Sequence, residues 1–436
     1  MKLPFGNSRF SLNASGFAGF FGGDAAVLAM ASGTMYIYEG AKWWGWYNCP
    51  GSYEIGKRFG QLAKSRFWNG LFPGPDIDPT VLFGLDGTKG PEFMSAFSCT
   101  IIPETGHLAH LFTRECKDLY PGVVVEGRQT RPVGVTVAEL SHEPDYEEHP
   151  KLRTPRSMLV TTIPIAVSIG TCIACGIFGD WYCFSMILLG IVSSGVAHLV
   201  IGGGQFSFVH PIPAAGCPDG DGLLDASDEV VILKGKEGAV NSITEGRFCF
   251  RFASEPLYND IAWCSVLLTL QFLAQLLLIP QSTLFGQLMF VVSLAVSWAY
   301  NSYLSSVDME KIQQGLLLNE ILGLPKLRKF RLGTRTSAAV FVMLVLRPGK
   351  VEQQLDELIP NDTALWRRWK ETVARKIRDG SGFDSPVDWD SHWTLEEMKL
   401  LDTLYGDARS AFIGYAKYCK DSDVFTHRQD IKEYAT

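Results

Sequence analysis

Positive charge is scarce in this sequence. The 39 lysines and arginines are outnumbered by 46 aspartates and glutamates, which gives a net charge of −7 at pH 7. A general nucleic-acid binder needs a basic face that neutralises phosphates. No nucleic-acid partner is therefore expected.

Motifs for catalysis and for metal binding are missing as well. No Gly-x-Ser-x-Gly nucleophile elbow occurs, and Gly202-Gly-Gly204 is not followed by the Lys-Ser or Lys-Thr of a phosphate loop. His107-x-x-His110 lacks the glutamate of a zinc-protease helix. Asp219-Gly-Asp-Gly222 begins like a calcium loop, but Leu223 stands where a third oxygen ligand is needed. We expect no cofactor, no metal and no catalytic residue.

A disulfide framework is also lacking, although the chain has ten cysteines. Cys172, Cys175, Cys183 and Cys264 lie in long apolar runs, where a free cysteine usually behaves as a small hydrophobic side chain. Cys172 and Cys175 have the spacing of a redox or zinc pair, but no second pair completes a tetrahedral site. These cysteines are predicted to serve packing.

Four long apolar runs stand out from this background. Each is about long enough to cross a bilayer, and they come in two pairs separated by very short turns. The sequence therefore predicts a membrane all-α fold built from two transmembrane helical hairpins, with small α+β cytoplasmic regions. The predicted spans are Met158–Gly179, Trp181–Gly202, Ile261–Ile279 and Leu284–Leu304.

A weaker apolar run covers Phe17–Tyr38 and is interrupted by Asp24. Its position and that acidic residue disfavour a secretory signal. Three alternatives stay open: a fifth membrane segment, a helix lying at the interface, or a buried helix of a soluble domain. The aromatic cluster that follows suits the headgroup level of a membrane, and it consists of Trp43, Trp44, Trp46 and Tyr47.

The spans divide the chain into four predicted regions. Residues 1–48 form an N-terminal apolar or interfacial segment, and residues 49–157 an irregular soluble region rich in turn residues. Residues 158–304 form the transmembrane domain, which contains a cytoplasmic insert at 203–259. Residues 305–436 form a cytoplasmic C-terminal helical region.

Short β-type runs and capping residues predict the elements of the soluble regions. Ala338–Leu346 is apolar, short and rich in valine, which favours a buried strand. One helix is expected from Asn361 or Asp362 to near Gly380, and another from Thr394, where Glu397 completes a capping box. The remaining predicted strands are Val123–Val125, Val133–Ala138, Val230–Lys234 and Arg247–Phe252, with a turn or short helix at Glu237–Glu245.

Lysines and arginines flank the outer ends of the spans, whereas the two hairpin tips carry none. The positive-inside rule then places both soluble flanks and the middle loop on the cytoplasmic side. If Phe17–Tyr38 also crosses, only a short N-terminal tail lies on the other side. The sequence predicts an integral membrane protein, in a membrane that the sequence does not specify.

Polar side chains form a stripe in the last two spans. Such side chains find no partner in lipid, and hydrogen bonds between helices contribute about 0.6–2 kcal/mol each. They either join the helices or line a path for a small solute. The stripe consists of Gln271 and Gln275 in the third span and of Gln287, Ser293, Ser297 and Asn301 in the fourth.

The helix predicted near residues 362–378 combines aromatic and basic side chains. It could lie on an anionic membrane surface, or it could pack on its own domain with a solvated basic side. The residues of this candidate membrane-surface helix are Trp366, Arg367, Arg368, Trp369, Lys370, Arg375, Lys376 and Arg378.

The segments Gly179–Gly190, Gln271–Gln275 and Ser293–Leu304 resemble uncharacterised multi-pass membrane proteins of fungi. The resemblance implies the membrane class and no particular activity. We therefore expect a non-enzymatic membrane scaffold or interaction protein, in contact with the bilayer and with itself or another membrane protein. The alternative is a small-solute transporter or channel subunit that uses the polar stripe.

Overall fold

The computed structural model of the chain divides into two compact units. Unit 1 comprises Met1–Gly87, His149–Phe208 and Phe248–Ile312, and unit 2 comprises Thr88–Glu148, Val209–Arg247 and Gln313–Thr436. The structure describes residues 21–32, 41–63, 78–150, 158–252, 255–385, 387, 389 and 393–433.

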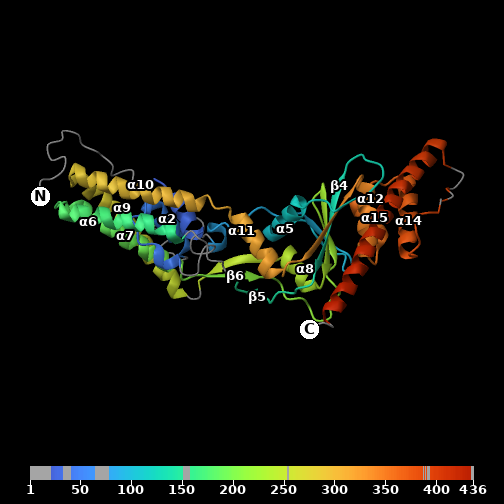
Figure 1. Cartoon of the computed structure of the whole chain (residues 1–436), viewed down its shortest axis with the longest axis horizontal. Coiled ribbons are helices and arrows are strands. Elements are labelled where there is room, and N and C mark those ends of the chain that lie inside the picture. The colour runs from blue at the N-terminus through green and yellow to red at the C-terminus, as the bar shows by residue number, and fades with distance from the viewer. Residues whose placement is uncertain are drawn as a thin grey trace. The chain divides into compact units, whose positions relative to one another are not determined.

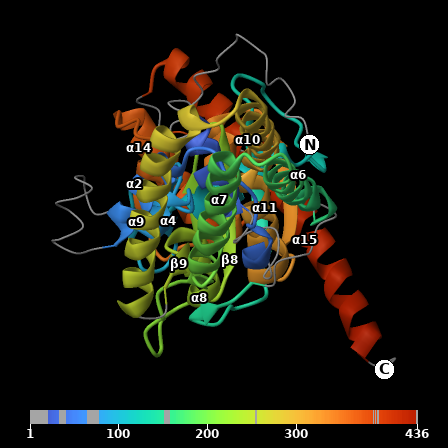
Figure 2. The ribbon, with the colours of Figure 1, turned by 90° about the vertical axis from the view of Figure 1, so that its left-hand side faces the viewer.

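Four long helices form the body of unit 1 (Figures 1 and 2). They match the four predicted spans, and all four are long and apolar enough to cross a membrane. Two of them begin on capped turns: the carboxylate of Asp180 caps α7, and the hydroxyl of Thr283 caps α10. The four long apolar helices expected from the sequence are thereby confirmed. The helices are α6 (Met158–Ile177), α7 (Trp181–Ile201), α9 (Glu255–Leu278) and α10 (Leu284–Ser305).

Side chains on the outside of this bundle are those that a bilayer requires. Isoleucine, leucine and valine side chains are exposed on all four long helices. Trp181 is 64% exposed at the start of α7, next to the tip of the first hairpin. Trp263 is 67% exposed near the start of α9, which is the end of the second hairpin away from its tip. Exposed tryptophans near both ends of the helices are typical of spans whose ends lie at membrane–water interfaces.

The N-terminal apolar run contributes a short helix. α1 (Gly23–Ser32) has ten residues and is therefore about 15 Å long, roughly half of what a bilayer crossing needs. It packs against α10 and α2, with Ala26 and Met30 fully buried. Residues 17–20 and 33–38 of the predicted segment lie outside the described residues.

A second short helix shows that the residues after 48 belong to the bundle. α2 (Ser52–Leu62) packs against α9, and Gly56 allows the approach because a Cβ atom on it would lie 3.1 Å from the carbonyl oxygen of Ser265. Unit 1 therefore extends to Gly87, whereas the sequence predicted a soluble region from residue 49. The other short elements of unit 1 are η2 (Ala41–Trp44), α4 (Pro79–Leu82), β6 (Gln205–Val209), β9 (Arg247–Arg251) and η3 (Ile279–Gln281).

Unit 2 contains a seven-stranded mixed sheet, so the fold is mixed α/β rather than membrane all-α with only small α+β regions. The strand order is β2-β1-β7-β8-β4-β10-β3, in which β4/β8 and β10/β3 are parallel pairs. The seven strands are β1 (Glu92–Ser95), β2 (Ile101–Ile102), β3 (Val123–Val124), β4 (Val133–Leu140), β7 (Gly222–Asp225), β8 (Glu229–Gly235) and β10 (Lys326–Leu332). A further short strand, β5 (Glu147–Glu148), is not part of this sheet.

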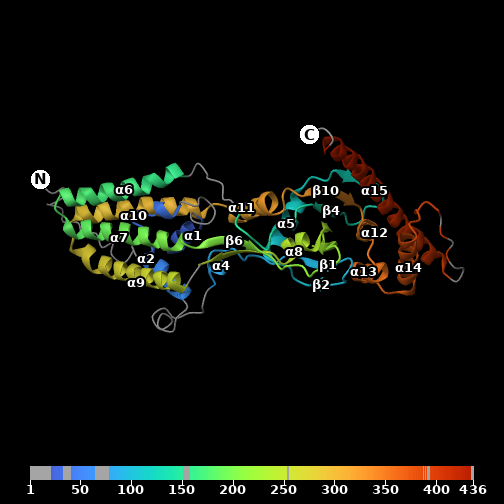
Figure 3. The ribbon, with the colours of Figure 1, turned by 90° about the horizontal axis from the view of Figure 1, so that it is seen from below.

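The central strand of this sheet, β8, carries apolar side chains on both of its faces because both faces are covered (Figure 3). In β8, Val230 and Ile232 belong to the large apolar core that includes α12, whereas Val231 and Leu233 are also fully buried but point to the other face, because side chains alternate along a strand. That second face is covered by α5 (His107–Asp118) and α8 (Glu237–Thr244).

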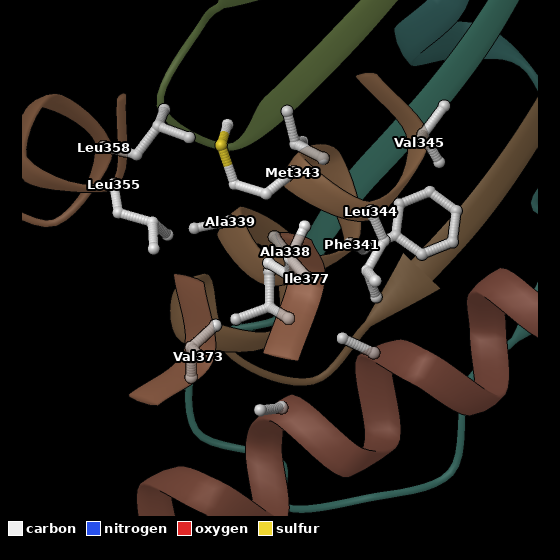
Figure 4. Packing of buried hydrophobic residues seen from close by; sticks show 14 of the residues in the cluster. Ala338, Ala339, Phe341, Met343, Leu344, Val345, Leu355, Leu358, Val373 and Ile377 are labelled. Atoms are coloured by element: carbon white, nitrogen blue, oxygen red, sulfur yellow. The ribbon is translucent and has the colours of Figure 1, made fainter. Parts of the chain in front are cut away.

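The segment predicted as a buried strand at Ala338–Leu346 is instead the central helix of unit 2, α12 (Arg335–Leu346). Thr334 and Ser337 form a reciprocal capping box at its start, and Arg347 ends it in a left-handed conformation (φ 47°). The helix is apolar all round because the sheet covers one side and other helices cover the rest (Figure 4).

The remaining helices of unit 2 pack around α12. Thr394 and Glu397 form the expected capping box at the start of α15. α14 is capped by Thr363 rather than by Asn361 or Asp362, and Gly380 follows its end with φ +63°. These helices are α13 (Val351–Leu358), α14 (Ala364–Arg378) and α15 (Leu395–Glu433), while α11 (Met309–Leu316) and η4 (Leu317–Ile321) follow the last span.

Candidate functional site

A non-helical segment, Gly45–Gly51, enters the helix bundle of unit 1 between η2 and α2. Tyr47, Asn48 and Cys49 are at most 4% exposed, although the sequence placed this stretch at the membrane surface. Backbone without helical hydrogen bonds is tolerated at membrane depth only where protein or a polar cavity surrounds it. The polar stripe predicted in the spans provides this environment.

Asn48 is the main anchor of the segment. Its backbone N–H donates to Ser168 Oγ on α6 at 3.0 Å, and its side-chain Nδ2 donates to Ser293 Oγ on α10 at 2.8 Å. Ser293 Oγ in turn donates to the carbonyl oxygen of Phe290. One asparagine thereby links the first and fourth spans.

The residues on either side of Asn48 share a second partner on α10. Tyr47 donates its hydroxyl to Asn301 Oδ1 at 2.8 Å, and Asn301 Nδ2 donates to Cys49 Sγ at 3.4 Å. All three side chains are buried. Ser293 and Asn301 lie eight residues apart on one face of α10, so the predicted stripe binds consecutive residues of the inserted segment.

Glycines make room for the segment. A Cβ atom on Gly190 of α7 would lie 2.0 Å from Asn48 Oδ1, and one on Gly195 would lie 2.3 Å from the Trp46 ring. A Cβ on Gly45 itself would meet the ring of His198 at 2.1 Å. By contrast, Gly170 on α6 has nothing within 4 Å of its Cβ position, so it takes no part in helix packing.

The three glutamines of the predicted stripe are buried, as are Ser293, Ser297 and Asn301. Gln275 Nε2 donates to the carbonyl of Met186 on α7 at 3.5 Å, and Gln287 Nε2 donates to the carbonyls of Ile279 and Ser282 at 3.3 Å. The stripe therefore makes hydrogen bonds to α7, to the second hairpin tip and to the inserted segment. The sequence predicted the stripe, but it did not predict that Tyr47 and Asn48 bind to it.

Several buried oxygen atoms of this region have no hydrogen-bond partner among the described residues. They include Asn48 Oδ1, Gln271 Oε1, Gln287 Oε1 and Ser297 Oγ. The Gln271 amide lies close to Asn48, because its Nε2 is 3.5 Å from the same Gly190 Cβ position. Ser297 lies one helical turn from both Ser293 and Asn301, which bind the segment.

The two hairpin tips are joined by Asp180, which is 3% exposed. One carboxylate oxygen accepts from the backbone N–H of Cys183, and the other accepts from the N–H and the hydroxyl of Thr283 at 2.8 and 2.5 Å. Gly286 leaves the space for this carboxylate. The residue therefore has a structural role at the tips.

Unit 2 has a polar groove of about 520 Å³ at the carboxyl ends of β4 and β8. Two of its carboxylates are in ion pairs: Glu139 pairs with Arg328 at 3.1 Å, and Glu143 pairs with Lys236 at 3.3 Å. Burial raises the pKa of Asp221, whose carboxylate accepts from the Gly235 N–H. Within the described ranges, no cluster of histidine, cysteine or acidic side chains could hold a metal ion.

α14, the candidate membrane-surface helix, packs into the core of unit 2. Trp369 is fully buried, and Lys370 is 4% exposed and pairs with Asp356 at 2.6 Å. Arg378 pairs with Glu352 at 2.8 Å, and Lys376 lies over the Phe383 ring. Arg367 likewise pairs with an acidic side chain, and Arg368 and Trp366 are partly buried. This geometry favours a helix of the soluble core, and the membrane-surface role stays a prediction.

Comparisons of the chain with protein-family models, with curated proteins and with solved structures find no match. The resemblance to fungal membrane proteins stays a prediction, because these comparisons do not bear on it.

Proposed function

We propose that the chain is a non-enzymatic membrane scaffold, in which unit 1 is a sealed anchor and unit 2 is the part that meets partners. The observation that supports this proposal most directly is the insertion of Gly45–Gly51 into the bundle. The polar side chains that a solute path would need are buried, and several bind this segment instead of facing an open passage. The alternative, a small-solute transporter or channel subunit, would require Gly45–Gly51 to move out of the bundle.

The chain connectivity agrees with an anchor. The three pieces of unit 2 are joined to unit 1 before α6, between α7 and α9, and after α10, which are the ends opposite the hairpin tips. With an even number of spans, all of unit 2 then lies on one side of the membrane. The positive-inside rule assigns that side to the cytoplasm.

The test is solute retention by vesicles that contain the purified full-length chain. The proposal expects these vesicles to retain small ions and neutral solutes as well as protein-free vesicles do, while the chain resists alkaline carbonate extraction. A solute leak that disappears in the double variant Gln271→Leu, Gln275→Leu would overturn the scaffold and establish transport. Gly170→Ala is the matched control, because nothing lies near its Cβ position.

A further inference from the structure

The side-chain amide of Gln271 on α9 forms no hydrogen bond with any described residue, although Gln271 is only 1% exposed. Asn48 of the inserted segment is fully buried, and its Oδ1 atom is also without a partner among these residues. The orientation of the Asn48 amide is determined by its neighbours, because Ser293 Oγ donates to Phe290 and therefore accepts from Asn48 Nδ2. Buried amide groups in this state indicate a small ligand between the segment and α9.

The two amides approach one point beside α7. A Cβ atom on Gly190 would lie 2.0 Å from Asn48 Oδ1 and 3.5 Å from Gln271 Nε2. The gap between these two atoms is therefore no longer than the two distances laid end to end. The atoms do not bond to each other directly, since Asn48 Oδ1 has no described partner. Two hydrogen bonds of about 2.8 Å each cover a gap of this length, so one small ligand can reach both atoms.

The polarity of the two atoms selects the ligand. Asn48 Oδ1 accepts hydrogen bonds, whereas Gln271 Nε2 donates them. A metal cation or an ammonium ion would face the amide hydrogens of Gln271, and an anion would face the carbonyl oxygen of Asn48. The ligand must therefore be neutral, must both donate and accept, and must place a single non-hydrogen atom in the gap. Water has all three properties.

We propose that a water molecule is bound between the inserted segment and α9, where it donates to Asn48 Oδ1 and accepts from Gln271 Nε2. Direct hydrogen bonds already join the segment to α6 and α10. The water extends this attachment to α9 and makes Gln271 a positioning residue for Gly45–Gly51. The site does not depend on the proposed function, because one enclosed water holds the segment whether or not a solute ever crosses the membrane.

The experiment is solid-state NMR of the full-length chain in lipid bilayers, with nitrogen-15 in its asparagine and glutamine side chains. It measures the transfer of magnetisation from water to the Asn48 amide. In Gln271→Leu this transfer should become slower by at least about threefold, because the water loses one of its two named partners. Gln275→Leu is the matched control on the same helix, since the Gln275 amide donates to the Met186 carbonyl instead, and it should retain the transfer.

The possible results separate the proposal from its alternatives. Unchanged transfer in Gln271→Leu, or an equal loss in both leucine variants, would overturn the bridging water. If Gln271→Leu does not fold, a structure of the unaltered chain that resolves ordered water decides. Density between Asn48 Oδ1 and Gln271 Nε2 would support the proposal, whereas a direct hydrogen bond between these atoms, or a gap without density, would overturn it.

Discussion

At the scale of single residues, glycine determines where the inserted segment can approach the long helices. Trp46 packs against Gly195 and Asn48 against Gly190, and both glycines lie on α7. These contacts join α7 to a segment that is remote in the sequence, and helical spacing alone carries no information about such a partner.

We expect Gly195→Ala to destabilise unit 1 by about 1–3 kcal/mol, because the added methyl group would overlap the Trp46 ring. Thermal unfolding in detergent measures the loss. Gly170→Ala, with nothing near its Cβ position, should leave the midpoint unchanged or raise it slightly. Equal effects of the two substitutions would show that Trp46 does not pack against Gly195 of α7.

Asp180 permits a second prediction at this scale. Asp180→Ala removes the cap of α7 and two charge-assisted hydrogen bonds to Thr283, so it should cost about 2–4 kcal/mol. A double-mutant cycle with Thr283→Val should show non-additive losses, because the two side chains share one contact. Additive losses would contradict the link between the hairpin tips.

At the scale of elements, a buried ion pair crosses the sheet of unit 2. Lys329 on β10 and Glu229 on β8 lie 3.1 Å apart with side chains 8% and 5% exposed. Lys329 also donates to the carbonyls of Cys116 and Lys117, and Thr136 donates to Glu229. The pair therefore ties β4, β8 and β10 to the end of α5. Desolvation raises the pKa of Glu229, and Lys329 and Thr136 partly oppose this rise.

Lys329→Met should destabilise unit 2 by about 3–5 kcal/mol at pH 8, because it leaves Glu229 buried and unpaired. The pKa of Glu229 in the folded chain lies above its ordinary value of 4.5. Such a carboxyl stabilises the folded state below pH 4.5, and this stabilisation is lost as the pH rises through the pKa of the folded state. The loss caused by the variant should therefore shrink on acidification toward pH 5. Hydrogen exchange of β4 and β8 at several pH values checks this, and a loss independent of pH would contradict it.

α14 gives a prediction that separates its two interpretations. If α14 is a core helix, Trp369→Ala should cost about 3–5 kcal/mol by leaving a cavity in the apolar core of unit 2, while Arg375→Gln on the exposed side should have little effect on stability. Denaturant unfolding of the full-length chain measures both. A stable Trp369→Ala variant that no longer binds anionic vesicles would instead support the membrane-surface role.

At the scale of the whole molecule, the arrangement of spans predicts which cysteines face which side. Cys217 is exposed in unit 2, and Gln281 is exposed at the second hairpin tip. In sealed vesicles, a membrane-impermeant thiol reagent should label Cys217 from the cytoplasmic side only and a Gln281→Cys variant from the opposite side. The Gln281→Cys substitution is made in a Cys217→Ser chain, so that Cys217 does not contribute to the labelling. Labelling of both from one side would exclude the two-hairpin topology.

The sequence alone determined the four spans, the polar stripe within them and the capping box of α15. These features depend on local sequence. A run of about twenty apolar residues in lipid forms a helix because the helix makes all its backbone hydrogen bonds internally, and a capping box involves residues three positions apart. Only the tertiary structure decided that Tyr47 and Asn48 enter the bundle and that Ala338–Leu346 is a helix. Both depend on partners far away in the chain, since a fully enclosed segment loses the one-sided pattern that distinguishes helix from strand.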